Sequence, residues 1–161
     1  GEGKGGEGAL FMAQKIHEAL AIGECEAWVY WAIADPAPSE FALMALSAPT
    51  PKYAAAKQYF RYIRPGAQRV TVTPASTTIL VSAYQHAEQK TITVVLINKN
   101  AARSDVKLLI KGMPAGITSF EAVRSSATES TAALAAVPVV GSSVSLTLPA
   151  QSVTTLFATY P

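Results

Sequence analysis

The first third of the chain carries the hydrophobic spacing of two helices separated by one apolar strand. Residues 9–22 place apolar side chains every three or four positions, as a helix with one buried face does, and Gly23 is a typical residue just beyond a helix end. Residues 27–33 are apolar throughout, which indicates a strand covered on both faces, as in a parallel sheet behind helices. The stripe of the first helix consists of Ala9, Met12, Ala13, Ile16 and Leu20.

A second helix is predicted to begin at Pro51, after a loop over residues 34–50. Thr50 is a favourable N-cap, and proline is favoured in the first helical turn. Pro65 and Gly66 end the helix, because proline cannot continue its hydrogen bonds and glycine permits a turn. Helix, strand and helix in this order favour an α/β barrel or a doubly wound sheet. The expected buried face of this helix is Tyr53, Ala56, Phe60 and Ile63.

After Gly66 the pattern changes to short strands rich in valine, isoleucine and threonine, separated by turn residues. Seven such strands without intervening helices predict an antiparallel β-sandwich, with Ile92, Val94 and Leu96 on one face of their strand. Residues 126–137 look like a low-complexity surface stretch. We therefore expect two parts, residues 1–65 and 66–161. The predicted strands cover residues 69–73, 77–85, 90–98, 106–111, 117–123, 143–148 and 152–160.

Composition excludes several classes of function. Half of the 161 residues are hydrophobic and the net charge is +2, so the chain has a core but no basic surface for nucleic acid or an anionic membrane. It also lacks an apolar run long enough to span a membrane. A single cysteine, Cys25, excludes an internal disulfide and a cysteine-built zinc site, and we expect it to be buried or half-buried. His17 borders the first helical stripe and is expected to pack there; no metal site or cofactor is predicted.

Four sequence blocks occur in an order that resembles the C-terminal part of glycoside hydrolase family 30. They are ALFMAQKIHEAL, AWVYWAI, PKYAAAKQYFRYIRPGAQRV and LPAQSVTTLF, and the segment ending Ile63-Arg64-Pro65-Gly66 is the most specific of them. The resemblance implies an α+β fragment: the last helix, strand and helix of a (β/α)8 barrel, followed by the antiparallel β-sandwich side domain of that family.

The resemblance also implies where the chemistry lies. In this family the nucleophilic glutamate ends the seventh barrel strand, which would place it just upstream of Gly1, with the general acid/base further upstream. No catalytic residue is therefore expected within this chain, which alone should be inactive. Glu2 and Glu7 lie in a glycine-rich stretch, and we interpret them as solvated loop charges because a retaining pair needs rigid support about 5–5.5 Å apart.

Trp31 is the candidate sugar-binding residue. Alternation along the strand places Trp31 with Val29 on one face and Trp28 with Tyr30 on the other, and Trp31 lies nearest the C-terminal end, where barrel active sites form. The alternative is that all three aromatic side chains pack in the core. The resemblance adds a cis peptide between Trp31 and Ala32. Asp35 and Glu40 follow the strand and could border the same site.

Two functions remain open. The first is the C-terminal segment of a secreted, retaining β-glycosidase that acts on xylan, β-1,6-glucan or β-1,6-galactan. The second is a non-catalytic carbohydrate-binding or structural sandwich, for which an exposed aromatic platform on the sandwich is the discriminating feature. The expected partners are a carbohydrate substrate and either the remainder of the barrel or a second copy of the chain, joined through residues 24–33. The candidate platform residues are Tyr84, Phe120, Phe157 and Tyr160; we expect Phe120 and Phe157 to lie in the core, so no platform is expected.

Overall fold

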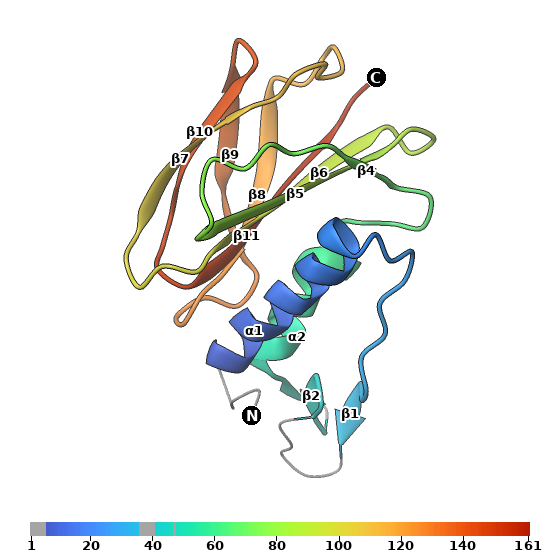
Figure 1. The fold of residues 1–161 in the computed structure, drawn as a ribbon, viewed down its shortest axis with the longest axis vertical. Helices are drawn as coiled ribbons and strands as arrows, with labels where there is room; N and C mark the ends of the chain where they lie inside the picture. The colour runs from blue at the N-terminus through green and yellow to red at the C-terminus, as the bar shows by residue number, and fades with distance from the viewer. Residues whose placement is uncertain (1–5, 36–40, 47) are drawn as a thin grey trace.

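A computed structural model describes residues 6–35, 41–46 and 48–161. The N-terminal part contains helix α1 (Gly6–His17), a π-helical turn η1 (Glu18–Ile22), helix α2 (Pro51–Phe60) and three two-residue strands, β1 (Ala34–Asp35), β2 (Met44–Ala45) and β3 (Ala48–Pro49). The remaining strands are β4 (Gln68–Val70), β5 (Ile79–His86), β6 (Thr91–Asn98), β7 (Ser104–Leu109), β8 (Ser119–Ser125), β9 (Ala132–Val140), β10 (Ser143–Leu148) and β11 (Ser152–Thr159). Both helices lie against one face of the large sheet (Figure 1).

Helix α1 confirms the predicted stripe. Met12, Ala13 and Ile16 are buried, and Ala9 and Leu20 pack at the edges of the same cluster. The helix begins at Gly6, three residues earlier than predicted. The π turn η1 follows it directly, and Gly23 ends this turn by donating its N–H to the carbonyl of Glu18. His17 is buried beside the stripe, as expected of a packing residue.

Helix α2 begins as predicted, but it buries a different face. Thr50 accepts a hydrogen bond from the N–H of Tyr53 and donates its own hydroxyl to the carbonyl of Leu43 at 2.7 Å. The predicted stripe is wrong at its two largest members, because Tyr53 and Phe60 are exposed. The helix packs against both α1 and the sheet, so small side chains and one tyrosine form these two contacts. The buried apolar residues are Ala54, Ala55, Ala56 and Tyr59.

The large sheet is antiparallel throughout and runs β4-β5-β6-β11-β8-β9-β10-β7. All seven predicted strands are present, and the described residues from 68 onward contain no helix. The eighth strand, β9, was missed: it occupies much of the stretch interpreted as a low-complexity surface. Alanine has a low strand propensity, so pairing with β8 and β10 must hold this segment extended.

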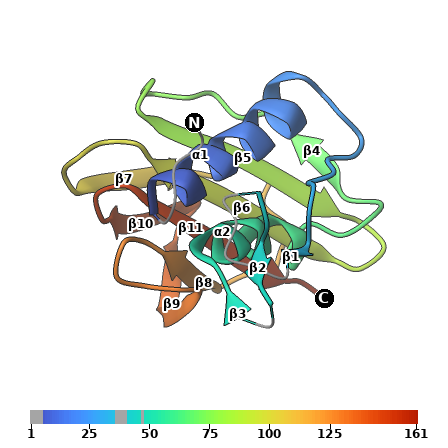
Figure 2. The ribbon, with the colours of Figure 1, turned by 90° about the horizontal axis from the view of Figure 1, so that it is seen from below.

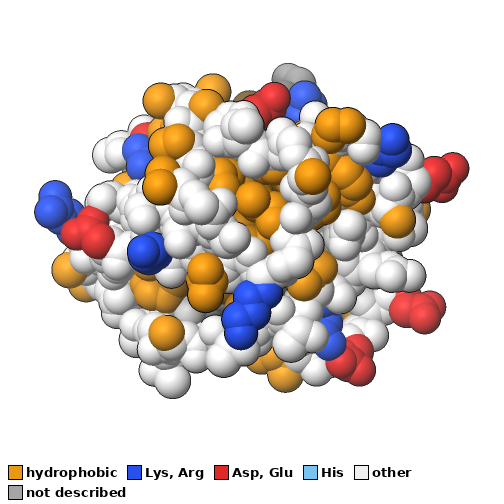
Figure 3. All heavy atoms as spheres, turned by 90° about the horizontal axis from the view of Figure 1, so that it is seen from above, with side chains coloured by type: hydrophobic (Ala, Val, Ile, Leu, Met, Phe, Trp, Pro, Cys, Tyr) orange, Lys and Arg blue, Asp and Glu red, His pale blue; other side chains and the backbone are white. Residues whose placement is uncertain are grey.

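The sheet curls on itself to form a sandwich. The pairing of β8 with β9 shifts register between Phe120 and Ala122, and such a bulge bends and twists a strand. Side chains from β6, β8, β10 and β11 then meet in one core, which includes Leu96, Phe120 and Leu156. Seen from the end away from the helices, apolar side chains gather at the centre of the face, so this core reaches the surface there (Figure 3).

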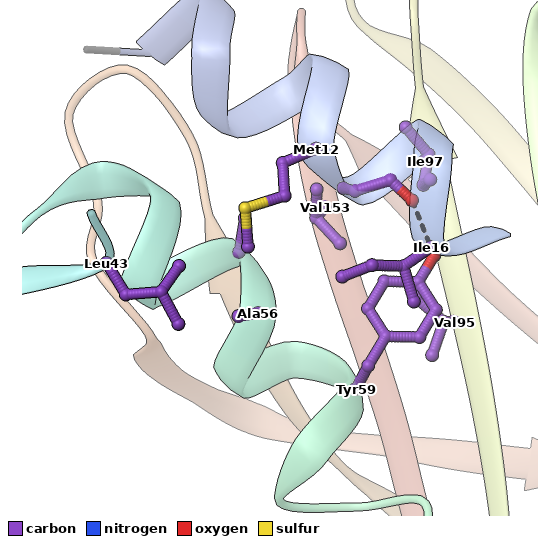
Figure 4. Close-up of a cluster of buried hydrophobic side chains, with 10 residues drawn as sticks. Met12, Ile16, Leu43, Ala56, Tyr59, Val95, Ile97 and Val153 are labelled. Carbon is purple, nitrogen blue, oxygen red and sulfur yellow. Dashed lines mark hydrogen bonds between the residues drawn. The ribbon is translucent and has the colours of Figure 1, made fainter. Parts of the chain in front are cut away.

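Strand β6 joins this sandwich core to a second one beneath the helices. All eight of its residues are buried. Ile92, Val94 and Leu96 point into the sandwich as predicted, whereas Val95 and Ile97 contact the helices. In the helix core, the Tyr59 hydroxyl donates a hydrogen bond to the carbonyl of Ala13 at 3.3 Å (Figure 4). The helices and the sandwich therefore share buried side chains.

The connection from α2 to the sandwich is fixed by one histidine. The His86 ring lies with Nε2 2.8 Å from the carbonyl oxygen of Pro65, and its Nδ1 accepts the N–H of Gln89. Gly66 has a φ of 94°, and a Cβ there would come within 3.0 Å of the same ring. A glycine is therefore needed where the chain passes from the helix to the strands.

Candidate sugar-binding segment and its surroundings

Residues 27–33 form an extended segment with one covered and one open face. The prediction of a strand buried on both faces is wrong for this chain: the segment forms no strand, and Val29, Trp31 and Ile33 are 89%, 87% and 70% exposed. The alternation itself is confirmed, since Trp28 and Tyr30 are half-buried against the helix core. The strand that follows the segment, Ala34–Asp35, lies parallel to β2.

The covered face is held by aromatic contacts to α2. The Trp28 and Tyr30 rings stack with centroids 5.6 Å apart, and Trp28 also meets Phe60 at 6.0 Å. The Lys52 ammonium donates a hydrogen bond to the Tyr30 hydroxyl at 3.2 Å and lies 5.8 Å from the centre of that ring. Through these contacts Trp28 and Tyr30 pack against α2, and Trp31 is left on the opposite side.

The backbone around Trp31 is fixed by the residues that follow. The peptide between Trp31 and Ala32 is cis, as the family resemblance implied. The Ala32 N–H donates to the carbonyl of Phe41 at 2.8 Å, and the Ala32 carbonyl accepts the N–H of Leu43 at 3.1 Å. The next residue, Ile33, accepts the N–H of Met44. The exposed indole is therefore carried on a backbone that is hydrogen-bonded immediately after it.

The open face is an apolar surface formed by Val29, Trp31 and Ile33. Phe41 and Leu46 are also exposed on the loop that pairs with the segment. Asp35 is half-buried, and its carbonyl accepts the N–H of Leu46; Glu40 lies outside the described residues. The flat face of an indole suits the C–H groups of a pyranose ring, so this surface has the chemistry of a sugar platform. Cys25, expected to be buried or half-buried, is exposed just before the segment.

Two of the described carboxylates are held in ion pairs with arginine side chains. Glu129 accepts two hydrogen bonds from Arg124 and one from Ser126, and these hold its pKa below the usual range, whereas a general acid needs a raised pKa. Glu24 is paired with Arg69. Glu7 lies in the first turn of α1 and not in a loop as predicted, and Glu2 lies outside the described residues.

The sandwich surface does not present the candidate aromatic platform. Phe120 and Tyr84 are buried, Phe157 is half-buried and meets Tyr62 at 5.5 Å, and the Tyr160 hydroxyl accepts a hydrogen bond from Gln85. Within the described part of the chain, no three His, Cys, Asp or Glu side chains gather as a metal site would require. None of the described helices has the length and apolar character needed to cross a membrane.

A concave site that the sequence did not predict lies between the helices and the sandwich. It is a hollow of about 290 Å³ at the N-terminal ends of α1 and α2, closed on one side by the loop between β8 and β9. Its walls come from four separate parts of the chain, which is why no local motif indicated it. The lining residues are Ala9, Leu10, Pro49, Thr50, Pro51, Ala54, Ala55, Ser125, Ser126, Ala127, Thr128, Glu129, Ser130, Gln151 and Val153.

Comparison with known proteins identifies the family. The profile described as the glycosyl hydrolase family 30 beta sandwich domain matches residues 66–156, more than half of the chain. The chain therefore belongs to glycoside hydrolase family 30.

Solved structures of this family share the fold of the chain. A family 30 endoxylanase from Clostridium papyrosolvens C71 is 26% identical, superimposes with a TM-score of 0.87 and is matched over 99% of this chain. A family 30 subfamily 8 xylanase from Clostridium acetobutylicum is 24% identical, with a TM-score of 0.86 over 98% of this chain. The family 30 xylanase C from Talaromyces cellulolyticus is 24% identical, with a TM-score of 0.81 over 94% of this chain. The chain spans only 40%, 40% and 35% of these three proteins.

Proposed function

We propose that this chain is the C-terminal segment of a retaining β-glycosidase, in which Trp31 forms the floor of the subsite that holds the sugar being cleaved. The single observation that carries this proposal is the division of the segment 27–33 into two faces. Trp28 and Tyr30 pack on α2, while Val29, Trp31 and Ile33 are left open on a fixed backbone. In a (β/α)8 barrel the face of a strand away from the helices points into the packed barrel interior, and the active site lies at the C-terminal end of the strands.

The remainder of the barrel is the proposed partner of that open face. The chain spans 40% of the family 30 endoxylanase, so the proposal assigns residues 1–65 to the end of a barrel and residues 66–161 to the side domain. The two catalytic carboxylates would then come from residues that precede this chain. A segment that exposes aromatic and β-branched side chains favours association, with the rest of the barrel or with a second copy of residues 24–33.

Xylan is the first substrate to test, with β-1,6-glucan and β-1,6-galactan next. The endoxylanase from Clostridium papyrosolvens supports this choice through its name and its 26% identity. Such polymers are too large to enter a cell, so we also propose that the enzyme acts outside it. A retaining mechanism would need two carboxyl groups about 5–5.5 Å apart across the cleaved bond. The part played by this chain is to bind and orient the sugar ring between them.

The test is substitution of Trp31 in the full-length enzyme. Trp31→Ala should lower kcat/KM on xylan by at least tenfold, which is about 1.4 kcal/mol of transition-state stabilisation. Trp31→Phe should retain much of the activity because it keeps an aromatic face. The matched control is Trp28→Ala, which removes the neighbouring indole from the covered face and should reduce thermal stability more than catalysis.

Two results would contradict the proposal. Full activity in Trp31→Ala, together with an inactive but folded Trp28→Ala enzyme, would mean that the two faces have been assigned the wrong way round. If the full-length wild-type enzyme releases no reducing sugar from any of the three polymers, none of them is its substrate.

A further inference from the structure

The hollow between the helices and the sandwich has walls of two chemical kinds. One side is apolar, formed by Leu10, Pro49, Pro51 and Val153, from the two helix starts and β11. The other side is polar and comes mainly from the loop between β8 and β9. In Figures 1 and 2 that loop lies at the end of the molecule where α2 begins. Ligand sites commonly combine such apolar walls with a few placed polar groups, and a volume of about 300 Å³ is near the lower end of their range.

The polar wall is held in place before any ligand arrives. Arg124 donates from Nε and Nη2 to the two carboxylate oxygens of Glu129, at 2.7 and 2.6 Å, and the Ser126 hydroxyl donates to the same carboxylate at 2.9 Å. Ser125 accepts hydrogen bonds from the Gln58 side chain at 2.8 Å and from the N–H of Thr131 at 3.1 Å. These bonds fix the loop to β8 and α2, so little conformational entropy need be lost on binding.

The same wall also offers polar groups that are not yet used. Thr128, Ser130 and Gln151 line the hollow and are exposed, and among the described residues their side chains form no hydrogen bond within the protein. A hydroxyl can both donate and accept, and so can a primary amide. The three side chains thus suit a ligand that carries many hydroxyl groups.

The charges at the hollow favour a neutral ligand. The Glu129 carboxylate is ionised, since Arg124 lowers its pKa, and it would repel a phosphate or a sulfate. Its negative charge is already matched by the Arg124 guanidinium at 2.6 Å, so a cation gains little there. An apolar wall opposite free hydroxyls then matches a pyranose ring, whose C–H face is apolar and whose rim is polar.

We propose that this hollow is a second saccharide-binding site, distinct from Trp31, that takes one or two sugar units of a neutral β-linked oligosaccharide. This rests on the proposed function, since it assigns a substrate chain to the same protein. Trp31 and the hollow are linked along the chain. The connection that follows residues 27–33 ends at Pro49, Thr50 and Pro51, which lead into α2 and line the hollow. The site would hold a polymer near the enzyme without taking part in bond cleavage.

The experiment uses the 161-residue chain itself and xylohexaose as the probe. Titration is followed by amide chemical shifts of residues 125–130 and Gln151 in ¹⁵N-labelled protein, in a Trp31→Ala background that removes the other platform. We expect saturable shifts with a Kd in the millimolar range, about −4 kcal/mol. Maltohexaose, which is α-linked, should bind about tenfold more weakly.

Three variants locate the binding. Ser130→Trp fills the hollow from an exposed position and should weaken binding by at least tenfold. Thr128→Val removes one hydroxyl at nearly constant volume and should weaken it a few-fold. Ser142→Trp, which places the same indole on the exposed turn between β9 and β10, is the matched control and should leave binding unchanged.

The outcomes separate this inference from the proposed function. No shift in residues 125–130 at saturating xylohexaose, or equal binding of maltohexaose, overturns the second site even if the full-length enzyme cleaves xylan. Conversely, a full-length enzyme without glycosidase activity overturns the proposed function while binding in the hollow can still be measured. Unchanged affinity in Ser130→Trp would show that the sugar binds elsewhere.

Discussion

Ile16 tests whether the helices and the sandwich are one cooperative structure. Its side chain is buried in the helix core, where it lies beside Tyr59 of α2 in a cluster that includes Val95 of β6 (Figure 4). Replacement by alanine removes three carbons from a site with contacts to both helices and to the sheet. If the shared core couples these elements, the change must weaken all of them together and not α1 alone.

The size of the effect follows from the burial of the residue. An Ile→Ala change in a packed core costs about 2–5 kcal/mol, because the lost transfer free energy is joined by the cost of the cavity. For a chain of this length that corresponds to a fall of roughly 4–20 °C in Tm. Ile16→Val removes one methyl group and should cost about 0.5–1.5 kcal/mol, which provides a milder variant if the alanine protein is poorly folded.

Urea unfolding followed by two signals measures the coupling. Tryptophan fluorescence reports on Trp28 and Trp31 beside the helices, and far-ultraviolet circular dichroism is dominated by the strands of the sandwich. Both transitions should move to lower urea together in Ile16→Val, whereas Val140→Ala, at an exposed position on β9, should change stability by less than about 0.5 kcal/mol. A fluorescence transition that shifts while the strand signal keeps its midpoint would refute the argument.

Two further predictions concern acid and the isolated chain. Burial lowers the pKa of His17, and Lys99 lowers it further while Glu18 opposes the shift, so the unfolded chain binds a proton more readily than the folded one. Stability should therefore be complete above about pH 6.5 and decrease as the pH falls below it, and His17→Gln should flatten this part of the pH profile. The chain alone should release no reducing sugar from xylan, and light scattering should show a mass above the 16.9 kDa of a monomer, because residues 27–33 expose an apolar face. Turnover that Glu7→Gln abolishes, or a monodisperse monomer, would contradict these expectations.

Local signals predicted the elements whose determinants are themselves local. Thr50 and Pro51 mark the start of α2 because an N-cap and a first-turn proline satisfy needs of the helix itself. The helical spacing from Ala9 to Leu20 found the buried stripe of α1 because a single face of that helix is covered. The same spacing argument predicted the wrong buried face for α2. This helix has contacts on two sides, which favour small alanine side chains, so the larger Tyr53 and Phe60 are exposed.

Strand β9 and the hollow were missed for a different reason. Residues 132–140 include four alanines and a proline, which lower strand propensity, and the pairing partners that hold them extended are set by the sheet as a whole. The hollow likewise depends on residues near positions 10, 50, 128 and 151 meeting in space. No single window of sequence contains the residues that determine either feature, so both became visible only in the fold.

The segments 27–33 and 91–98 show most clearly what an apolar run does and does not establish. Both lack regular alternation in sequence, and both were interpreted as strands. Strand β6 has neighbours on both sides, helices over one face and the sandwich over the other, and every residue in it is buried. Residues 27–33 have α2 over one face only, so Val29, Trp31 and Ile33 are open. An apolar run therefore predicts that its residues will be buried, but which parts of the protein pack over them depends on residues outside the run. In one case that cover is within this chain; in the other, the proposed barrel would supply it and leave the Trp31 indole at its substrate-binding end.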